Sequence, residues 1–307
     1  MPDAVRVSVV TPTWNRARYL PGCIESVLAQ EFSGVEHVIV DDGSTDDTPA
    51  VLARYAKSHG ARVRTARQEN GGQSAAWNRC LDMARGEFVA FLDSDDAWLP
   101  GRLARQIPML EADGGAGMLY AAVRYVDAEG KPSPVRRSRR GTPSGRILPT
   151  LLLHNVMDSG SVIVRRSALE EAGRFDPAIR EGNDWDMWLR IALRHRVLHD
   201  PTLSVLMRRH ADQMIADNER MAEGLLRVME KNLRRLEKDG PEHLSLARRL
   251  AARQYLKRAR RLLGEGRREE GEARLARALE LDPSARPGTV ILRLRAGLRR
   301  ALRRGRR

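Results

Sequence analysis

The chain has 307 residues, 42% of them hydrophobic, which is enough for a sizeable core and favours about two domains. No run reaches the ~18 apolar residues of a membrane span, and residues 1–4 lack the basic and apolar regions of a signal peptide. Two cysteines, Cys23 and Cys80, exclude a disulfide framework and a cysteine metal cluster, so we expect a reducing, cytoplasmic compartment.

The formal net charge of +14 predicts a boundary between two domains. Residues 1–220 hold 29 Lys and Arg against 29 Asp and Glu, whereas residues 221–307 hold 25 against 11. The second segment therefore carries the whole excess charge of 14. We expect one domain over residues 1–220 and an Arg-rich helical extension over residues 221–307.

Short apolar runs alternate with helical patterns through the first domain, which predicts an α/β fold with a mainly parallel sheet. The predicted strands are 5–10, 35–40, 63–66, 88–92, 117–126, 161–164 and 197–206. The predicted helices are 17–29, 48–58, 73–84, 100–113 and 184–194. Residues 130–145, rich in Pro, Ser, Gly and Arg, are expected to form a mobile loop.

From about residue 212 onward, the chain is predicted to be helical. Residues 252–283 indicate a helical hairpin around residues 264–266, and its end resembles the close of a single tetratricopeptide repeat without the usual Trp and Tyr positions. A binding role and simple packing both remain open for this hairpin. In residues 290–307, Leu and Ile alternate with eight Arg at helical spacing, which predicts an amphipathic basic helix.

An acidic cluster, Asp93-Ser94-Asp95-Asp96, follows the apolar run 88–92. That run is typical of a buried parallel strand, and parallel strands end at the edge where α/β proteins bind ligands. The three carboxylates repel one another, and a divalent cation with oxygen ligands would relieve that cost and hold an anion such as a diphosphate. A solvated acidic turn that caps the next helix explains the spacing equally well.

Two further motifs follow predicted strands on the same edge, at residues 11–16 and 40–44. Trp14 is suited to stacking on a nucleotide base, or else it packs while its segment caps a helix. Asp42 is suited to accepting a hydrogen bond from a base or a ribose, or else it forms an Asx turn with the Gly and Ser that follow it.

A fourth motif, residues 183–186, opens a helix whose other face is apolar. Asp184 in this motif is either an N-cap, the ordinary role of an Asp at a helix start, or a catalytic base beside a pocket. Taken alone, this motif favours the cap.

Taken together, the motifs resemble those of family 2 glycosyltransferases, which have the GT-A fold. The resemblance covers roughly residues 5–215 and rests on the order and approximate spacing of several segments. These segments are 9–15, 38–48, 70–78, 88–96 and 183–190, and residues 158–161 and 173–176 resemble segments that usually precede the catalytic one.

The resemblance implies an inverting transfer from a nucleoside diphosphate sugar, most simply a UDP-sugar, to an acceptor hydroxyl, with Mn²⁺ or Mg²⁺ as cofactor. It also implies a role for each residue at a matching position. These residues are Pro12, Trp14 and Asp42 for the base; Asn70, Gly72 and Asn78 for the nucleotide and sugar; Asp93 for the ribose or donor sugar; Asp95 and His210 for the metal; Arg208 and His210 for the diphosphate; and Asp184 as general base.

The chain departs from the family pattern at two of these motifs. Asn183 precedes the implied base where the family usually has Glu, and Trp14 stands where Tyr is usual. The Gln-x-x-Arg-Trp segment of the processive polysaccharide synthases is absent, as is a membrane span. The resemblance therefore implies a non-processive enzyme.

The implied partners are the donor and a glycan or lipid-linked acceptor in cell-surface polysaccharide synthesis. The basic helix over residues 290–307 fits an anionic membrane surface, which would give the protein a peripheral position at the inner face of the membrane. A solvated surface without a partner is the alternative. Nucleic acid is not expected, because the tail nearly lacks aromatic residues.

Two other functions compete with glycosyl transfer. A nucleotidyltransferase also pairs acidic residues with a nucleotide-binding sheet, but it usually carries a Gly-rich basic loop, and residues 11–16 contain no Gly. A non-catalytic scaffold that binds membrane or RNA through residues 221–307 predicts that nucleotides leave the stability of the protein unchanged.

Overall fold

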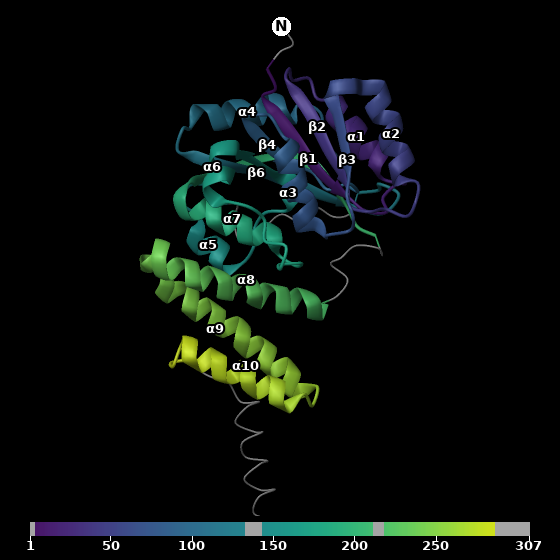
Figure 1. Cartoon of the computed structure of the whole chain (residues 1–307). Helices are drawn as coiled ribbons and strands as arrows, with labels where there is room; N and C mark the ends of the chain where they lie inside the picture. The colour runs from purple at the N-terminus through teal and green to yellow at the C-terminus, as the bar shows by residue number, and fades with distance from the viewer. Residues whose placement is uncertain (1–3, 133–142, 211–217, 286–307) are drawn as a thin grey trace, which may run out of the picture. The chain divides into compact units, whose positions relative to one another are not determined.

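The computed structural model of the chain describes residues 4–132, 143–210 and 218–285 (Figure 1). It divides into two compact units, Met1–Asn218 and Glu219–Arg307. The predicted basic helix over residues 290–307 lies outside the described residues, as does most of the predicted loop over residues 130–145. Within the described ranges, no helix combines the length and the apolar character needed to cross a membrane.

The first unit is built on a sheet that, in the described residues, has eight strands in the order β3-β2-β1-β4-β7-β6-β8-β5. Strands β1 to β4 pair in parallel, as do β6 and β8, while β7 and β5 pair antiparallel with their neighbours. The strands are β1 Val7–Thr13, β2 Val35–Asp41, β3 Val63–Arg67, β4 Phe88–Phe91, β5 Ala97–Trp98, β6 Ala116–Val126, β7 Val162–Arg165 and β8 Arg196–Arg208. The predicted α/β fold with a mainly parallel sheet is confirmed.

Helices cover both faces of this sheet, because successive side chains of a strand point to opposite sides. The helices are α1 Leu20–Leu28, α2 Thr48–His59, α3 Gln73–Met83, α4 Arg102–Ala112, α5 Leu148–Leu153, α6 Arg166–Ala172 and α7 Asn183–Arg194. Ala90 in β4 packs in a cluster with Leu103 of α4, whereas Phe91 contacts Trp77 of α3 and Trp188 of α7 edge-on. Figure 1 shows α3 and α7 on the same side of the sheet.

Three of the described α-helices and β-strands are absent from the predicted set: β5, α5 and α6. Each is too short to show a helical or alternating period by itself, because two to seven residues hold at most about two turns of helix. The predicted strand at 197–206 is also longer in the structure, where β8 runs to Arg208. That extension brings Arg208 to the edge of the sheet where the candidate site lies.

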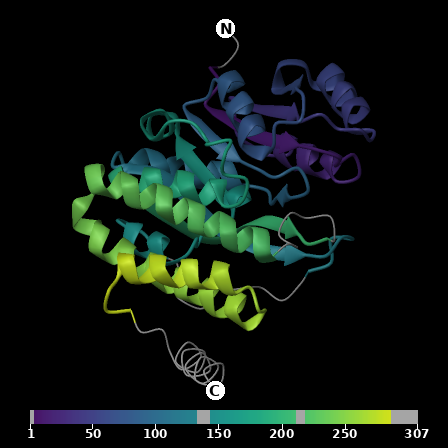
Figure 2. The ribbon, with the colours of Figure 1, turned by 60° about the horizontal axis from the view of Figure 1, so that its bottom comes forward.

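The second unit consists, in its described residues, of α8 Asn218–Asp239, α9 Pro241–Gly264 and α10 Arg268–Leu281, which Figure 2 shows from a second side. Leu226, Ala252, Tyr255, Leu256 and Ala278 form its buried apolar cluster. The α9–α10 hairpin starts at Pro241, earlier than the predicted residue 252, and its turn includes Gly266 at φ 81°.

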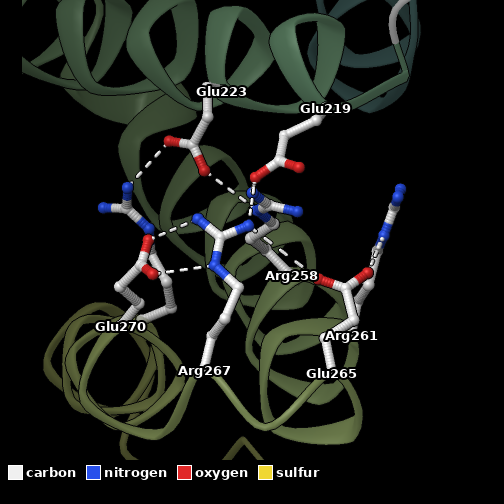
Figure 3. Close-up of polar contacts among 8 residues, drawn as sticks. Glu219, Glu223, Arg258, Arg261, Glu265, Arg267 and Glu270 are labelled. Atoms are coloured by element: carbon white, nitrogen blue, oxygen red, sulfur yellow. Dashed lines mark hydrogen bonds and ion pairs between the residues drawn. The ribbon is translucent and has the colours of Figure 1, made fainter.

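Ion pairs connect the three helices of this unit (Figure 3). Arg258 of α9 is buried and donates to Glu223 (Nε–Oε1, 2.9 Å) and to Glu219 (Nη2–Oε1, 2.7 Å), both on α8. Arg267 also pairs with Glu219, and it donates to Glu270 of α10 (Nη2–Oε2, 2.7 Å). Two glutamates of α8 thus neutralise the buried charge of Arg258 through its Nε and Nη2 groups.

Candidate active site

The loops after β1 and β2 meet at one edge of the sheet, because the two strands are parallel and Thr13 is in register with Asp41. Asn15, at φ 52°, donates its backbone N–H to Ser44 Oγ (2.9 Å) and accepts from the backbone N–H of Thr45 at Oδ1 (2.8 Å). A non-glycine residue at positive φ is uncommon and is best tolerated by Asn or Asp. Asn15 therefore fixes the two loops against each other.

Trp14 and Pro12 lie beside this junction in different environments. Pro12 is buried within β1, whereas Trp14 is 50% exposed, and few other large apolar side chains among the described residues are as open to solvent. An exposed indole at the ligand edge of a parallel sheet is available for stacking on a flat partner.

Asp42 fastens the turn that precedes α3. Its carboxylate accepts from the backbone N–H groups of Gly71 (Oδ1, 2.9 Å) and Gly72 (Oδ2, 2.8 Å) and from Gln68 Nε2 (2.7 Å). Asn70 Nδ2 donates to the Asp42 carbonyl at 2.9 Å. The structure thus brings the predicted residues Asp42, Asn70 and Gly72 together and also gives Asp42 a structural function.

The carboxylates after β4 have three different surroundings. Asp93 accepts from Ser159 Oγ at 2.5 Å, and burial together with the Asp95 carboxylate raises its pKa to about 7. Asp96 is buried and accepts from the backbone N–H of Arg208 at 2.8 Å, and burial holds its pKa well above the ordinary value. Such like-charge crowding at a sheet edge is typical of a site that receives a cation.

Asp95 is paired with His210, which follows β8. Asp95 Oδ2 lies 2.9 Å from His210 Nε2 and 3.5 Å from Arg16 Nε, and the His210 ring stacks on Tyr19 with centroids 4.8 Å apart. Asp95 and His210 are more than one hundred positions apart in the sequence but lie in contact in the fold. The two residues predicted to bind the metal are neighbours in the structure.

The Asp95–His210 pair is small for a metal site by itself. Within residues 4–132, 143–210 and 218–285, no group of three or more His, Cys, Asp or Glu side chains is arranged to hold a metal ion. Mg²⁺, however, is usually bound by one or two carboxylates together with substrate phosphates, and carboxylate oxygen also suits Mn²⁺. The pair fits a metal whose other ligands come from a diphosphate and water.

Arg208 connects the acidic cluster with the loop after β6. Its Nε donates to the Asp95 carbonyl (3.1 Å), its Nη1 donates to the Ala128 carbonyl (3.0 Å), and its guanidinium lies over the Tyr19 ring at 5.1 Å. These contacts hold a positive charge next to Asp95 and Asp96. A cation in this place is suited to contacting an anionic group bound there.

Asp184 lies in the first turn of α7, but it is not the N-cap, because that position is taken by Gly182 at φ 76°. The carboxylate is partly exposed, with Oδ1 accepting from the Trp185 backbone N–H (2.7 Å) and Oδ2 from Asn155 Nδ2 (3.1 Å). Burial, with a further contribution from Asp158, raises its pKa to about 6. A carboxyl group with such a pKa is suited to general-base chemistry near neutral pH.

Asn183 and Asn78 hold the helices that carry the site. The buried amide of Asn183 donates to Ser74 Oγ (3.0 Å), which links α7 to α3. The Asn78 amide donates to the Phe175 carbonyl and accepts from the Phe175 N–H, both at 2.9 Å. Asn78, predicted to line the nucleotide and sugar side, has its amide engaged with the backbone of a neighbouring segment in this structure.

Four residues of the site were not predicted: Arg16, Tyr19, Asn155 and Ser159. The last two lie in or beside a segment whose family resemblance is visible in the sequence, at residues 158–161. Their contacts to Asp184 and Asp93 join segments that are far apart in the chain. A local pattern therefore marks the segment but does not indicate which carboxylate it contacts.

Comparisons with known proteins identify the family of the chain. The profile described as Glycosyl transferase family 2 matches residues 8–173, and the chain belongs to this family. Among curated relatives, the putative teichuronic acid biosynthesis glycosyltransferase TuaG of Bacillus subtilis is 30% identical over 186 residues, which cover 60% of this chain and 71% of TuaG. Other relatives are longer, and the chain spans 35% and 56% of two of them.

Solved structures confirm the GT-A fold. TarS of S. aureus (residues 1–349) in complex with UDP-GlcNAc matches with a TM-score of 0.63 at 22% identity, covering 81% of this chain and 71% of that one. The mannosyltransferase PcManGT of Pyrobaculum calidifontis, in complex with GDP-Man and Mn²⁺, matches with a TM-score of 0.63 at 23% identity, covering 97% and 81%. The protein is a family 2 glycosyltransferase, and structural neighbours bind nucleotide sugars.

Proposed function

We propose that this glycosyltransferase moves a sugar, with inversion, from a nucleoside diphosphate sugar to an acceptor hydroxyl, and that it depends on Mn²⁺ or Mg²⁺. The observation that carries the proposal is that two carboxylates of the site, Asp95 after β4 and Asp184 in α7, have different surroundings. Asp95 lies beside His210 and Arg16, whereas Asp184 has a pKa raised to about 6. One group suits a metal diphosphate and the other suits a proton transfer.

The donor nucleotide is proposed to bind across the loops after β1, β2 and β4. Trp14 offers an exposed ring to the base, and Asp42 and Gly72 offer polar groups on the turn before α3. Asp93, with its partner Ser159, is proposed to contact the ribose or the donor sugar. The neighbours include complexes with UDP-GlcNAc and with GDP-Man, and we propose a UDP-sugar as the first donor to test.

In the proposed reaction, Asp184 accepts the proton of the acceptor hydroxyl as that oxygen attacks C1 of the donor sugar. A bond forms between this oxygen and C1 while the bond from C1 to the diphosphate oxygen breaks, through an oxocarbenium-like state. The leaving nucleoside diphosphate carries the electron pair away. Attack from the side opposite the leaving group gives inversion at C1.

Asp95 and His210 are proposed to hold the divalent metal, whose chemical contribution is to neutralise the negative charge that develops on the diphosphate. Arg208, fixed by carbonyl groups beside the acidic cluster, and Arg16 add positive charge at the same place. The developing charge is thus met by cations that are held in position before the reaction begins.

The acceptor is proposed to be a glycan or a lipid-linked sugar of a cell-surface polysaccharide. TuaG is named for teichuronic acid biosynthesis, which supports this class of acceptor. An attachment of residues 290–307 to an anionic membrane surface, with the enzyme at the inner membrane face, remains a proposal that rests on eight Arg alternating with apolar residues.

The substitution Asp184→Asn tests the assignment of the base. It removes the proton acceptor but keeps the size of the side chain, so transfer should fall by at least ~10²-fold. Donor binding, measured by calorimetry with the nucleotide sugar and Mn²⁺, should stay unchanged. Near-normal turnover by a folded variant that binds the donor would refute this role for Asp184.

A further inference from the structure

The loop after α5 contacts the proposed base directly. Asn155 Nδ2 lies 3.1 Å from Asp184 Oδ2, on the oxygen that the helix does not bind. The other oxygen, Oδ1, accepts from the Trp185 N–H of the same helix turn at 2.7 Å. Each oxygen of the carboxylate therefore has a different donor, and the plane of the group is determined by both.

The orientation of the Asn155 amide is set by a second contact. Asn155 Oδ1 accepts from the backbone N–H of Met157 at 3.2 Å, so the oxygen end of the amide faces its own loop. The NH₂ end must then face Asp184, because an amide turned the other way would place its oxygen against the carboxylate. Asn155 is thus a donor to the charged form of Asp184.

A second hydrogen bond joins helix α7 to α5, the helix that precedes this loop. Trp185 is buried, and its indole N–H donates to the Leu151 carbonyl of α5 at 2.7 Å. This bond fixes the first turn of α7 to the segment that carries Asn155, and Figure 1 shows α5 beside α7. The donor and the carboxylate are therefore held by packed elements of the same unit.

We propose that Asn155 is the positioning residue of the catalytic base: its amide holds Asp184 Oδ2 so that the carboxylate presents a fixed lone pair to the acceptor hydroxyl. The inference rests on the proposed function, since it assumes that Asp184 is the base. Asn155 does not itself touch the reacting atoms. It acts by orienting the carboxylate and by favouring its ionised form.

The charged groups near Asp184 raise its pKa, whereas the hydrogen bond from Asn155 lowers it. Asp158, three residues further along the same loop, and Asp93 of the acidic cluster are both close enough to disfavour a second negative charge. The amide of Asn155 and the Trp185 N–H counteract them. Loss of the Asn155 donor should therefore move the titration of Asp184 to higher pH.

Three variants separate positioning from simple packing. Asn155→Ala removes the donor, whereas Asn155→Asp keeps the shape and the acceptor for Met157 but places a second carboxylate against Asp184. Leu153→Ala, at an exposed side chain in the preceding helix, is the matched control. If Asn155 only filled space, Asn155→Asp would behave like the wild type.

The first readout is the pH profile of nucleoside diphosphate release from the donor that the wild type hydrolyses, with water as acceptor. In Asn155→Ala we expect the midpoint of the acid limb of kcat to move to higher pH by about one unit. This is the size of shift that the loss of one hydrogen bond to a charged group should cause. A larger rise is expected in Asn155→Asp. The donor KM and the Leu153→Ala profile should not change. Equal profiles for wild type and Asn155→Ala would overturn the inference.

The second readout does not need turnover. The ¹³C carboxyl resonance of Asp184, assigned from its absence in Asp184→Asn, is titrated in the wild type and in Asn155→Ala without donor. A higher midpoint in Asn155→Ala supports the inference, and an unchanged midpoint refutes it. If Asp184→Asn keeps near-normal turnover, the proposed function of Asp184 fails, and this titration still shows whether Asn155 controls the pKa of Asp184.

Discussion

At the level of single residues, the carboxylates of the site differ in the partners that surround them. Asp42 accepts from backbone N–H groups of a turn, Asp95 lies beside His210 and Arg16, and Asp184 faces other carboxylates and accepts from the Asn155 amide. Burial and the nearby Asp158 carboxylate raise the pKa of Asp184 and so disfavour its ionised form. The same residue type is thereby suited to structure, to metal binding and to proton transfer.

As the proposed base, Asp184 should set the pH dependence of turnover, because its pKa is raised to about 6. A general base acts only when it is deprotonated, so kcat should fall tenfold for each pH unit below about 6 and level off above it. Initial rates measured from pH 4.5 to 8 with saturating donor give this limb. A flat profile down to pH 5 would mean that another group accepts the proton.

The hydrogen bonds of Asp42 can be tested by stability. Asp42→Asn keeps the volume but turns an NH₂ group toward a backbone N–H, so at least one N–H donor of the turn loses its charged acceptor. The free energy of unfolding should fall by about 1–3 kcal/mol in urea. The exposed Asp47→Asn, whose carboxylate makes no capping hydrogen bond, is the control and should change it by less than about 0.5 kcal/mol. Equal stability of both variants would exclude this function for Asp42.

At the level of elements, the sequence was sufficient to predict the strands that end at the site. The apolar runs of β2 and β4 are buried throughout nearly their whole length, and each is followed directly by polar residues, so their common edge follows from parallel pairing. The short helix α5 and the strand β5 could not be predicted, because their sequences hold no complete period. Long-range packing determines them.

Side-chain contacts between distant segments were the other part that the sequence could not supply. The resemblance placed His210 and Asp95 in one site, but the 2.9 Å contact between them depends on how far β8 extends along β6. The contact of Asn155 with Asp184 depends in the same way on the packing of α5 against α7. Sequence spacing carries no information on either contact.

The helices of the second unit should lose stability in acid. Arg267 and Arg258 lower the pKa of Glu219 to about 2, below its ordinary value of 4.5. A carboxylate with a lowered pKa stabilises the fold above pH 4.5, and this contribution disappears as the pH falls toward 2. The thermal stability of the helices can be followed by circular dichroism during heating, at pH 6 and at pH 3. The decrease in stability from pH 6 to pH 3 should be smaller in Glu219→Gln than in the wild type.

The control for this measurement is Glu237→Gln, which removes an exposed pair between Glu237 and Arg248. Exposed pairs contribute little to stability, so the stability of this variant should decrease from pH 6 to pH 3 as much as that of the wild type. If Glu219→Gln and Glu237→Gln responded alike, the ion pairs in Figure 3 would not be the source of the acid sensitivity.

At the level of the whole molecule, the chain combines a GT-A glycosyltransferase unit with a helical unit in which arginines are partly neutralised by glutamates of α8. The family of the first unit is shown by the profile match, and its fold is shown by the solved structures. The domain boundary near residue 220 and the role of the basic tail remain predictions. The central claim is that a metal and a nucleotide bind together at Asp95.

The most direct test of that claim is a thermal-shift panel of UDP, GDP, dTDP and CMP, each with and without Mn²⁺, on the wild type, on Asp95→Asn and on the exposed control Asp82→Asn. A ligand at 100 times its Kd adds ~2.7 kcal/mol of stability. We predict a shift with one nucleotide that requires Mn²⁺, persists in Asp82→Asn and is lost in Asp95→Asn. A shift that survives Asp95→Asn, or no shift with any nucleotide, would contradict the account.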